Sequence, residues 1–250
     1  ALICTSHGVK DAVVRMQQAK AEYLKDRLGA VRTVLPQLPV IPLGIDAQEF
    51  NFGDAERRAA RLALGVDENT IVILYAGRLN FHGKAHPLAM YLALQKAAAT
   101  MPDSQKAVLF QCGWHASEFS AKAYDEAARY ACPSVEVRTL PEKDRRAAWA
   151  GADIFCSLSD SIQESFGLTP VEAMAAGLPV IVSDWDGYKD TVRDGIDGIR
   201  IPTLMPAAGF GRDLALRHAL QIDPYELYCG HSSALVSIDV DAAAAAFKLM

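Results

Sequence analysis

The stretch from Ala152 to Ser183 constrains the fold most, because it contains one complete β-α-β unit. The apolar run Ala152–Leu158 predicts a buried strand, and Val180–Val182 predicts the next one. Between them, Pro170 suits the first turn of a helix, where its missing N–H would have no partner, and Gly177 ends that helix. Strands joined in this way lie parallel in one sheet, and open α/β sheets bind ligands at the carboxyl ends of such strands. We therefore expect a site in the loop after the first strand.

Apolar runs and amphipathic segments alternate in the same way on the amino-terminal side of this unit. Further strands are expected at Thr70–Ala76, Ala107–Cys112 and Val135–Thr139, and helices at Asp54–Leu64, His86–Thr100, Ser117–Ala131 and Glu142–Ala150. Asp54 is expected to be the N-cap of its helix. The pattern predicts an α/β fold with a doubly wound, Rossmann-like parallel sheet.

The chain begins with a strand and a long helix that stand apart from this alternation. Leu2–Thr5 predicts the strand, and Ser6 is the expected N-cap of a helix from about Val9 to Leu28. Gly29 then ends the helix. Because the chain starts in a strand and ends within a predicted helix, we expect more sequence on both sides.

Composition and charge exclude several classes of function. The net charge of -5 over 250 residues gives no general basic field, so no nucleic acid is expected as a partner. The five cysteines are odd in number and lack a Cys-x-x-Cys spacing, which indicates buried thiols in a reducing compartment. No apolar run approaches the roughly 20 residues of a membrane helix. We therefore expect no integral membrane segment and a cytoplasmic location, free or peripheral to a membrane.

Two carboxylates flank the start of the helix that contains Pro170. Glu164 precedes this helix and Glu172 lies in its first two turns. Backbone N–H groups near residues 166–169 and the positive end of the helix dipole favour a phosphate there. The carboxylates beside it can accept hydrogen bonds from sugar or ribose hydroxyls. Together these groups indicate a site for a nucleotide sugar.

Two basic residues follow the strand Thr70–Ala76. Arg78 comes directly after Gly77, and Lys84 lies six residues beyond Arg78. A guanidinium can bind a pyrophosphate through a bidentate fork, and an ammonium can bind it as a point charge. These residues therefore supply the cationic half of the same expected site.

The motifs resemble those of the retaining, GT-B-type glycosyltransferases of the "group 1" family (family 4). The stretch Glu164-Ser-Phe-Gly-Leu-Thr-Pro-Val-Glu172, followed by Ala-Gly-Leu-Pro-Val, is similar to that family's signature of two Glu separated by seven residues. Gly77-Arg78-Leu79 with Lys84 is similar to its Gly-Arg-Leu...Lys-Gly pair. Ala85 stands where Gly is usual, and the loop between Arg78 and Lys84 is one residue longer.

Other segments carry the same resemblance. Residues 40–50 are similar to the linker between the two Rossmann-like halves of the GT-B fold. This assigns residues 1–44 to the tail of an N-terminal acceptor domain and the interdomain linker, and 45–250 to a C-terminal nucleotide-sugar-binding domain. Residues 184–190 and 194–198 resemble the family's glycine-rich turns, and turn glycines explain both segments without any chemistry.

The resemblance implies the C-terminal half of a GT-B glycosyltransferase, with a remnant of the N-terminal domain. It implies transfer of a hexose from a nucleoside diphosphate sugar to a hydroxyl acceptor, which could be a glycan, a lipid-linked group or a small molecule. The anomeric configuration would be retained, with no metal and no other cofactor. Glu164 would contact the sugar, Glu172 the ribose, and Arg78 with Lys84 the diphosphate. The expected catalytic residues are Glu164, Arg78 and Lys84, and the expected donor-binding residues are Glu172, Phe166, Gly167, Leu168, Thr169, Gly77 and Leu140.

Alternatives remain open at this point. A nucleotide-binding regulatory module without catalysis, or an epimerase or phosphorylase on the same architecture, would share much of the site. Residues 202–237 do not follow the family pattern and form an insertion of unclear role. Its His218, Cys229 and His231 have unmatched spacings, which favour structural roles over a metal site. Trp114 either packs or stacks on a ligand, and no role is assigned to His7, His82, His86 and His115.

Overall fold

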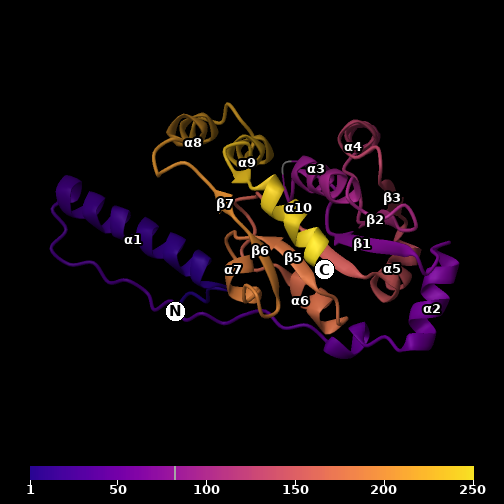
Figure 1. The fold of residues 1–250 in the computed structure, drawn as a ribbon. Helices are drawn as coiled ribbons and strands as arrows, with labels where there is room; N and C mark the ends of the chain where they lie inside the picture. Colours follow the sequence, from indigo (N-terminus) through magenta and orange to yellow (C-terminus); the bar gives the residue numbers. More distant parts are fainter. Residues whose placement is uncertain (82) are drawn as a thin grey trace.

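The computed structural model describes residues 1–81 and 83–250 and confirms the predicted fold class. Its centre is a six-stranded sheet in the order β3-β2-β1-β4-β5-β6, and every neighbouring pair is parallel (Figure 1). The strands are β1 (Thr70–Ala76), β2 (Lys106–Cys112), β3 (Glu136–Leu140), β4 (Ile154–Ser157), β5 (Val180–Ser183) and β6 (Gly198–Ile201). The strand order reverses between β1 and β4, which is the position where doubly wound sheets form their ligand crevice.

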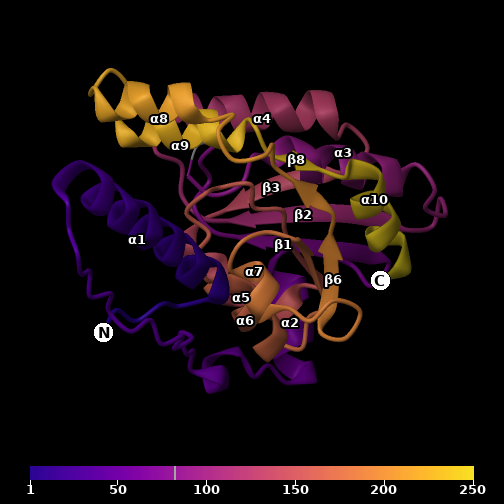
Figure 2. The same ribbon diagram turned by 90° about the vertical axis from the view of Figure 1, so that its left-hand side faces the viewer.

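Helices cover both faces of the sheet (Figures 1 and 2). One face packs against α3 (Pro87–Ala98), α4 (Glu118–Ala131) and α10 (Val240–Leu249), and the other against α5 (Arg145–Gly151) and α6 (Leu168–Ala175), while α2 (Asp54–Ala63) packs on α5. Successive side chains of β1 alternate between the two cores: Ile73 and Tyr75 face the first, and Val72 and Leu74 face the second. Burial on both faces explains why β1 is a continuous apolar run in the sequence.

Three expected elements differ in detail. Leu2–Thr5 makes one bridge, between Cys4 and Val40, and three backbone hydrogen bonds to residues 37–41, but Pro39 has no N–H and the pairing does not extend into a strand. Asp54 is not an N-cap, since Gly53 takes that position and Asp54 lies in the first turn. Residues 142–151 divide into the 3-10 turn η2 (Glu142–Asp144) and the helix α5.

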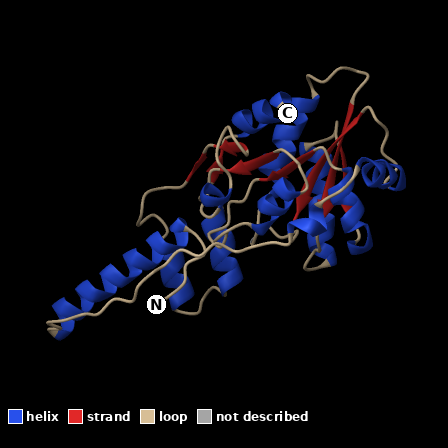
Figure 3. Cartoon of the chain, turned by 90° about the horizontal axis from the view of Figure 1, so that it is seen from below, coloured by secondary structure: helices blue, strands red, loops and turns tan. Residues whose placement is uncertain are grey.

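The helix α1 (His7–Leu28) projects away from the sheet, and an extended chain returns beside it (Figure 3). The Oγ atom of Ser6 accepts a hydrogen bond from Val9 N–H at 3.2 Å, and Gly29 ends the helix in the left-handed conformation, as the sequence predicts. The start of α1 contacts the main domain through a bond from Thr5 Oγ1 to the Ser165 carbonyl. Beyond this extended segment, the 3-10 turn η1 (Ala47–Phe50) leads into α2.

The insertion at residues 202–237 folds as a helical pair closed by a short ladder. Strands β7 (Thr203–Leu204) and β8 (Ser237–Ile238) pair antiparallel and enclose α8 (Arg212–Ala219) and α9 (Tyr225–Ser233). The Arg217 guanidinium binds the buried Asp223 carboxylate through two bonds, of 2.7 and 2.8 Å. This bidentate pair fixes the turn between the two helices.

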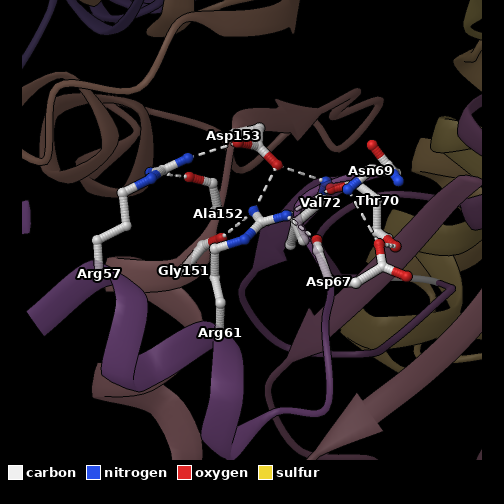
Figure 4. Close-up of polar contacts among 9 residues, drawn as sticks. All are labelled: Arg57, Arg61, Asp67, Asn69, Thr70, Val72, Gly151, Ala152 and Asp153. Atoms are coloured by element: carbon white, nitrogen blue, oxygen red, sulfur yellow. Dashed lines mark hydrogen bonds and ion pairs between the residues drawn. The ribbon is translucent and has the colours of Figure 1, made fainter. Parts of the chain in front are cut away.

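One carboxylate ties α2 to the sheet (Figure 4). Asp153, directly before β4, accepts hydrogen bonds from the guanidinium groups of Arg57 and Arg61 and from the backbone N–H of Val72. Arg61 also donates to three backbone carbonyls, those of Gly151, Asp67 and Thr70. The network therefore fixes α2 to the amino ends of β1 and β4.

We expect Arg61→Met to lower the free energy of unfolding by about 2 to 3 kcal/mol, because it leaves Asp153 and three carbonyls short of a donor. Arg57→Met is the matched control and should cost less than half as much, since the Arg57 side chain is 38% exposed and that of Arg61 only 13%. Urea denaturation measures both. Equal losses would show that the network does not depend on the more buried arginine.

Candidate active site at the carboxyl edge of the sheet

The loops after β1 and β4 bring two of the predicted catalytic residues into contact. Lys84 Nζ lies 2.6 Å from Glu164 Oε2, and the side chains are 18% and 6% exposed. Buried charges are stable only when they are paired. The Ser159 hydroxyl donates to the Lys84 carbonyl at 2.7 Å and fixes the loop after β1 to the loop after β4. The pair therefore stands at the point where the strand order reverses.

Glycines allow the backbone to approach closely at the end of β1. Gly77 has φ +153°, and its N–H donates to the Cys112 carbonyl. A Cβ atom on Gly113 would lie 1.8 Å from the Gly77 carbonyl oxygen, so only glycine fits there. This geometry presents Arg78 at the edge, where it is exposed and donates to the Gly83 carbonyl at 3.2 Å.

The amino terminus of α6 faces the same edge. Gly167 is its N-cap with φ 88°, and a Cβ atom there would lie 2.3 Å from the Tyr188 ring. The backbone N–H groups of Leu168 and Thr169 open the helix and have no intrahelical acceptor, as in every helical first turn. Phe166 is buried beneath them, 6% exposed. The predicted residues 166–169 thus form a turn beside Glu164 whose backbone N–H groups can bind an anion.

Glu172 lies on α6 with unused hydrogen-bonding capacity. Within the part of the chain that the structure describes, its Oε2 atom and the Thr169 hydroxyl are buried without a hydrogen-bond partner. Burial raises the pKa of Glu172, while the positive charges of Arg145 and Lys84 lower it. Buried polar atoms are rarely left unpaired in the functional state, so a ligand with hydroxyl groups would complete this pair.

Tyr188 supports the ion pair and was not predicted. Its side chain is fully buried, and its hydroxyl shares a 2.7 Å hydrogen bond with Ser157 Oγ. Lys84 Nζ lies 5.9 Å from the centre of its ring, within cation-π range. Burial raises the pKa of Tyr188 well above its ordinary value, so the hydroxyl stays neutral. Tyr188 lies in the segment 184–190, which was interpreted from its glycine as a turn without a chemical role. For that reason Tyr188 was not assigned to the site.

Two further side chains near the site were missed. Arg145, at the start of α5, contributes a positive charge that lowers the pKa of Glu172. Asp186 has the left-handed backbone angle φ 38°, and burial together with the charge of Glu164 raises its pKa to about 6. Residue type alone does not show that the side chains of Arg145 and Asp186 lie near the site, so the sequence could not assign them to it.

Some predicted residues lie elsewhere. Leu140 ends β3 with a side chain that is 8% exposed and packed in the second core, which leaves only its backbone for a ligand. Trp114 is 60% exposed, so it does not pack in the core. His115 lies edge-on to Tyr124, and burial lowers its pKa. His82 lies outside the described residues.

His218 of the insertion makes structural contacts. The His218 ring stacks on Tyr228, and its Nδ1 lies 3.0 Å from the Asp223 carbonyl oxygen. Cys229 is buried as a free thiol. Among residues 1–81 and 83–250, no three His, Cys, Asp or Glu side chains gather as a metal ion requires.

We expect Gly167→Ala to abolish nucleotide binding and to destabilise the domain by more than about 3 kcal/mol, because it adds a clash with Tyr188 to backbone strain. Gly177→Ala is the matched control: Gly177 also has a positive φ, 74°, but nothing lies within 4 Å of its added Cβ. It should cost about 1 kcal/mol from strain alone. Thermal melts and calorimetry on both variants check this. Equal costs would mean that Tyr188 does not constrain the turn.

The fold matches that of GT-B glycosyltransferases of known structure. The structure superposes on Anabaena Alr3699/HepE in complex with UDP-glucose, with a TM-score of 0.56 and 21% identity over 97% of this chain and 58% of that one. It also superposes on sucrose-phosphate synthase of Thermosynechococcus elongatus, with a TM-score of 0.54 and 20% identity over 98% of this chain and 53% of that one. At such identities the likeness establishes the fold.

Sequence comparison establishes the family. Residues 56–208 match the model of the "Glycosyl transferases group 1" family, and the chain belongs to it. The D-inositol 3-phosphate glycosyltransferase of Geodermatophilus obscurus is 32% identical over 213 residues, 79% of this chain and 43% of the relative. That of Streptomyces bingchenggensis is 31% identical over 228 residues, 87% of this chain and 46% of the relative. The chain thus spans less than half the length of these relatives. No helix in the described part is both long and apolar enough to cross a membrane.

Proposed function

We propose that this chain carries the donor-binding half of a retaining glycosyltransferase, which moves a hexose from a nucleoside diphosphate sugar to a hydroxyl acceptor. The observation that carries the proposal is the buried Lys84–Glu164 pair beside the amino terminus of α6. A cation, a carboxylate and free backbone N–H groups meet there at the carboxyl ends of β1 and β4. These are the groups that a diphosphate joined to a sugar requires.

The positive groups would stabilise the departing diphosphate. Arg78 would bind it through its guanidinium fork, Lys84 as a point charge, and Leu168 and Thr169 through their backbone N–H groups. Negative charge grows on the diphosphate as the glycosidic bond breaks, and donors fixed in advance stabilise it without reorganisation. We therefore propose that no metal ion is needed to neutralise the leaving group.

The two carboxylates would bind different parts of the donor. Glu164, held by Lys84, would position the sugar, and Glu172 with the Thr169 hydroxyl would bind the ribose. The structural neighbour that was crystallised with UDP-glucose supports UDP-sugars as the first donors to test. The five cysteines are buried and free, which fits a reducing compartment such as the cytoplasm.

Residues 1–44 would be the end of a domain that holds the acceptor. His7, the first residue of α1, donates its N–H to the Asp190 carboxylate, and its Nδ1 lies 3.0 Å from the same oxygen. The helix is therefore attached to the donor half at the edge that carries Glu164. Because transfer needs both substrates in one closed cleft, this chain alone should bind donor but transfer little.

Because Glu164 and Glu172 would bind different parts of the donor, variants of the two residues test the proposal. Glu172→Gln should weaken UDP and UDP-glucose alike, by about tenfold, because both contain ribose. Glu164→Gln should leave UDP affinity unchanged and reduce sugar transfer by the full-length protein. Glu68→Gln, an exposed carboxylate just before β1 at the opposite edge of the sheet, is the control. Calorimetry and a transfer assay on the same preparations measure both effects. Identical behaviour of the two variants would contradict the proposed roles, and release of an altered free sugar would indicate an epimerase.

A further inference from the structure

Two consecutive residues of the loop after β4 hold the backbone on either side of Ala85. The Ser159 hydroxyl donates to the Lys84 carbonyl at 2.7 Å. The Asp160 carboxylate accepts the backbone N–H of His86, with both of its oxygens 3.3 Å from the nitrogen. These contacts engage the peptide groups before and after Ala85, and fixing both planes fixes the φ and ψ angles between them. The Lys84 side chain therefore starts from a fixed point of the loop after β1.

The loop that carries Ser159 is fixed in turn by the segment at the end of β5. The Ser183 hydroxyl donates to the Ser159 carbonyl at 2.6 Å, and both residues are fully buried. The Trp185 indole N–H donates to the Ser161 carbonyl at 2.8 Å. Buried polar groups that have partners make a structure rigid. The loop after β4 is therefore a rigid support for residues 84–86.

The Asp160 carboxyl does not stabilise the fold at neutral pH. Burial raises its pKa from the usual 3.8 to about 7, although the bond from His86 acts in the opposite direction. The contribution of this group to stability is therefore greatest below pH 3.8 and is lost as the pH rises to about 7. A buried carboxyl that is costly to ionise and lies beside a site is a candidate for a functional role.

We propose that Asp160 and Ser159 are positioning residues of the donor site, which act through Lys84. They hold the backbone of residues 84–86 so that Lys84 Nζ lies 2.6 Å from Glu164 Oε2. The Asp160 carboxylate also lies before the first turn of α3, where the helix dipole favours a negative charge. The contacts stand on the structure, whereas a diphosphate bound by Lys84 rests on the proposed function.

Two replacements of Asp160 separate positioning from packing. Asp160→Asn keeps an oxygen that can accept the His86 N–H, whereas Asp160→Ala removes it. We expect calorimetric titration of the whole chain to show UDP affinity about tenfold lower in Asp160→Ala and within about twofold of wild type in Asp160→Asn. Asp223→Ala is the control, because Asp223 is also a buried carboxylate, 3% exposed, but lies in the insertion. It should lower the melting temperature and leave UDP affinity unchanged.

Two further variants test whether the effect passes through Lys84. In the Lys84→Met background, Asp160→Ala should cause no further loss of UDP affinity, because the group that it positions is gone. Ser159→Ala removes only the hydroxyl that holds the Lys84 carbonyl and should weaken UDP binding about fivefold. It decides the proposal if Asp160→Ala does not fold. Unchanged affinity in these variants, equal losses in Asp160→Ala and Asp160→Asn, or a further loss in the Lys84→Met background would overturn the proposal.

Crystal structures of the same variants separate this proposal from the proposed function, because the ion pair is visible without UDP. Lys84 Nζ should keep its 2.6 Å contact with Glu164 in Asp160→Asn and lie more than about 4 Å away in Asp160→Ala. If the wild-type chain does not bind UDP, the proposed function fails and this distance decides the positioning role. An ion pair that is unchanged in both Asp160→Ala and Ser159→Ala would overturn the proposal even if UDP binds.

Discussion

Replacement of Lys84 by methionine is expected to lower kcat/KM of the full-length protein by about a thousandfold, the effect of removing a central charge-stabilising group. Methionine keeps the length of the side chain but removes the ammonium that would meet the diphosphate. It also leaves the Glu164 carboxylate, 6% exposed, without its partner at 2.6 Å. An unpaired buried charge is costly, so the variant should also lose about 3 kcal/mol of stability.

A double variant separates the loss of activity from the loss of stability. Lys84→Met with Glu164→Gln removes both charges and should recover much of the stability, yet it should remain inactive, since the diphosphate still lacks its cation. Lys122→Met, at an exposed position of α4, is the control for the loss of a positive charge. Denaturant titrations and initial-rate kinetics measure the effects. Transfer within threefold of wild type in Lys84→Met would remove Lys84 from the site.

Arg78→Ala is expected to weaken binding of UDP by about 2 to 4 kcal/mol, because it removes a charge-assisted bidentate contact. The fold should be unaffected, since Arg78 is exposed and Gly77 and Gly113 set the backbone geometry. Arg78→Lys should restore only part of the affinity, because an ammonium lacks the planar fork. Calorimetric titration gives all three affinities. Equal affinity of wild type and Arg78→Ala would exclude a contact with the diphosphate.

The sequence predicts those parts of the fold that depend on local pattern. Continuous apolar runs such as Thr70–Ala76 identify strands that are buried on both faces, and Gly177 marks the end of a helix through its need for positive φ. Parallel strands gather their carboxyl ends at one edge, so loop residues such as Arg78 and Glu164 could be assigned to one site without coordinates. The predicted division at residue 44 stays a prediction.

Contacts between distant residues could not be predicted in the same way. The Lys84–Glu164 bond joins residues 80 positions apart, and its length depends on how two loops fold against each other. Tyr188 was missed because its role is to fill the space left by Gly167, which only the packed structure reveals. Leu2–Thr5 has strand composition, but its neighbour contains three prolines and donates to it through Ile41, so the pairing stops at a single bridge. Residues 202–237 do not follow the family pattern, so the pairing of α8 with α9 behind the β7–β8 ladder emerged only from the structure.

The most direct test of the account is a crystal structure of this chain with UDP. We predict the diphosphate within hydrogen-bond distance of the Arg78 guanidinium, Lys84 Nζ and the backbone N–H groups of Leu168 and Thr169, with the ribose hydroxyls on Glu172. UDP ordered elsewhere, with the edge between β1 and β4 left to solvent, would contradict the assignment of the donor site.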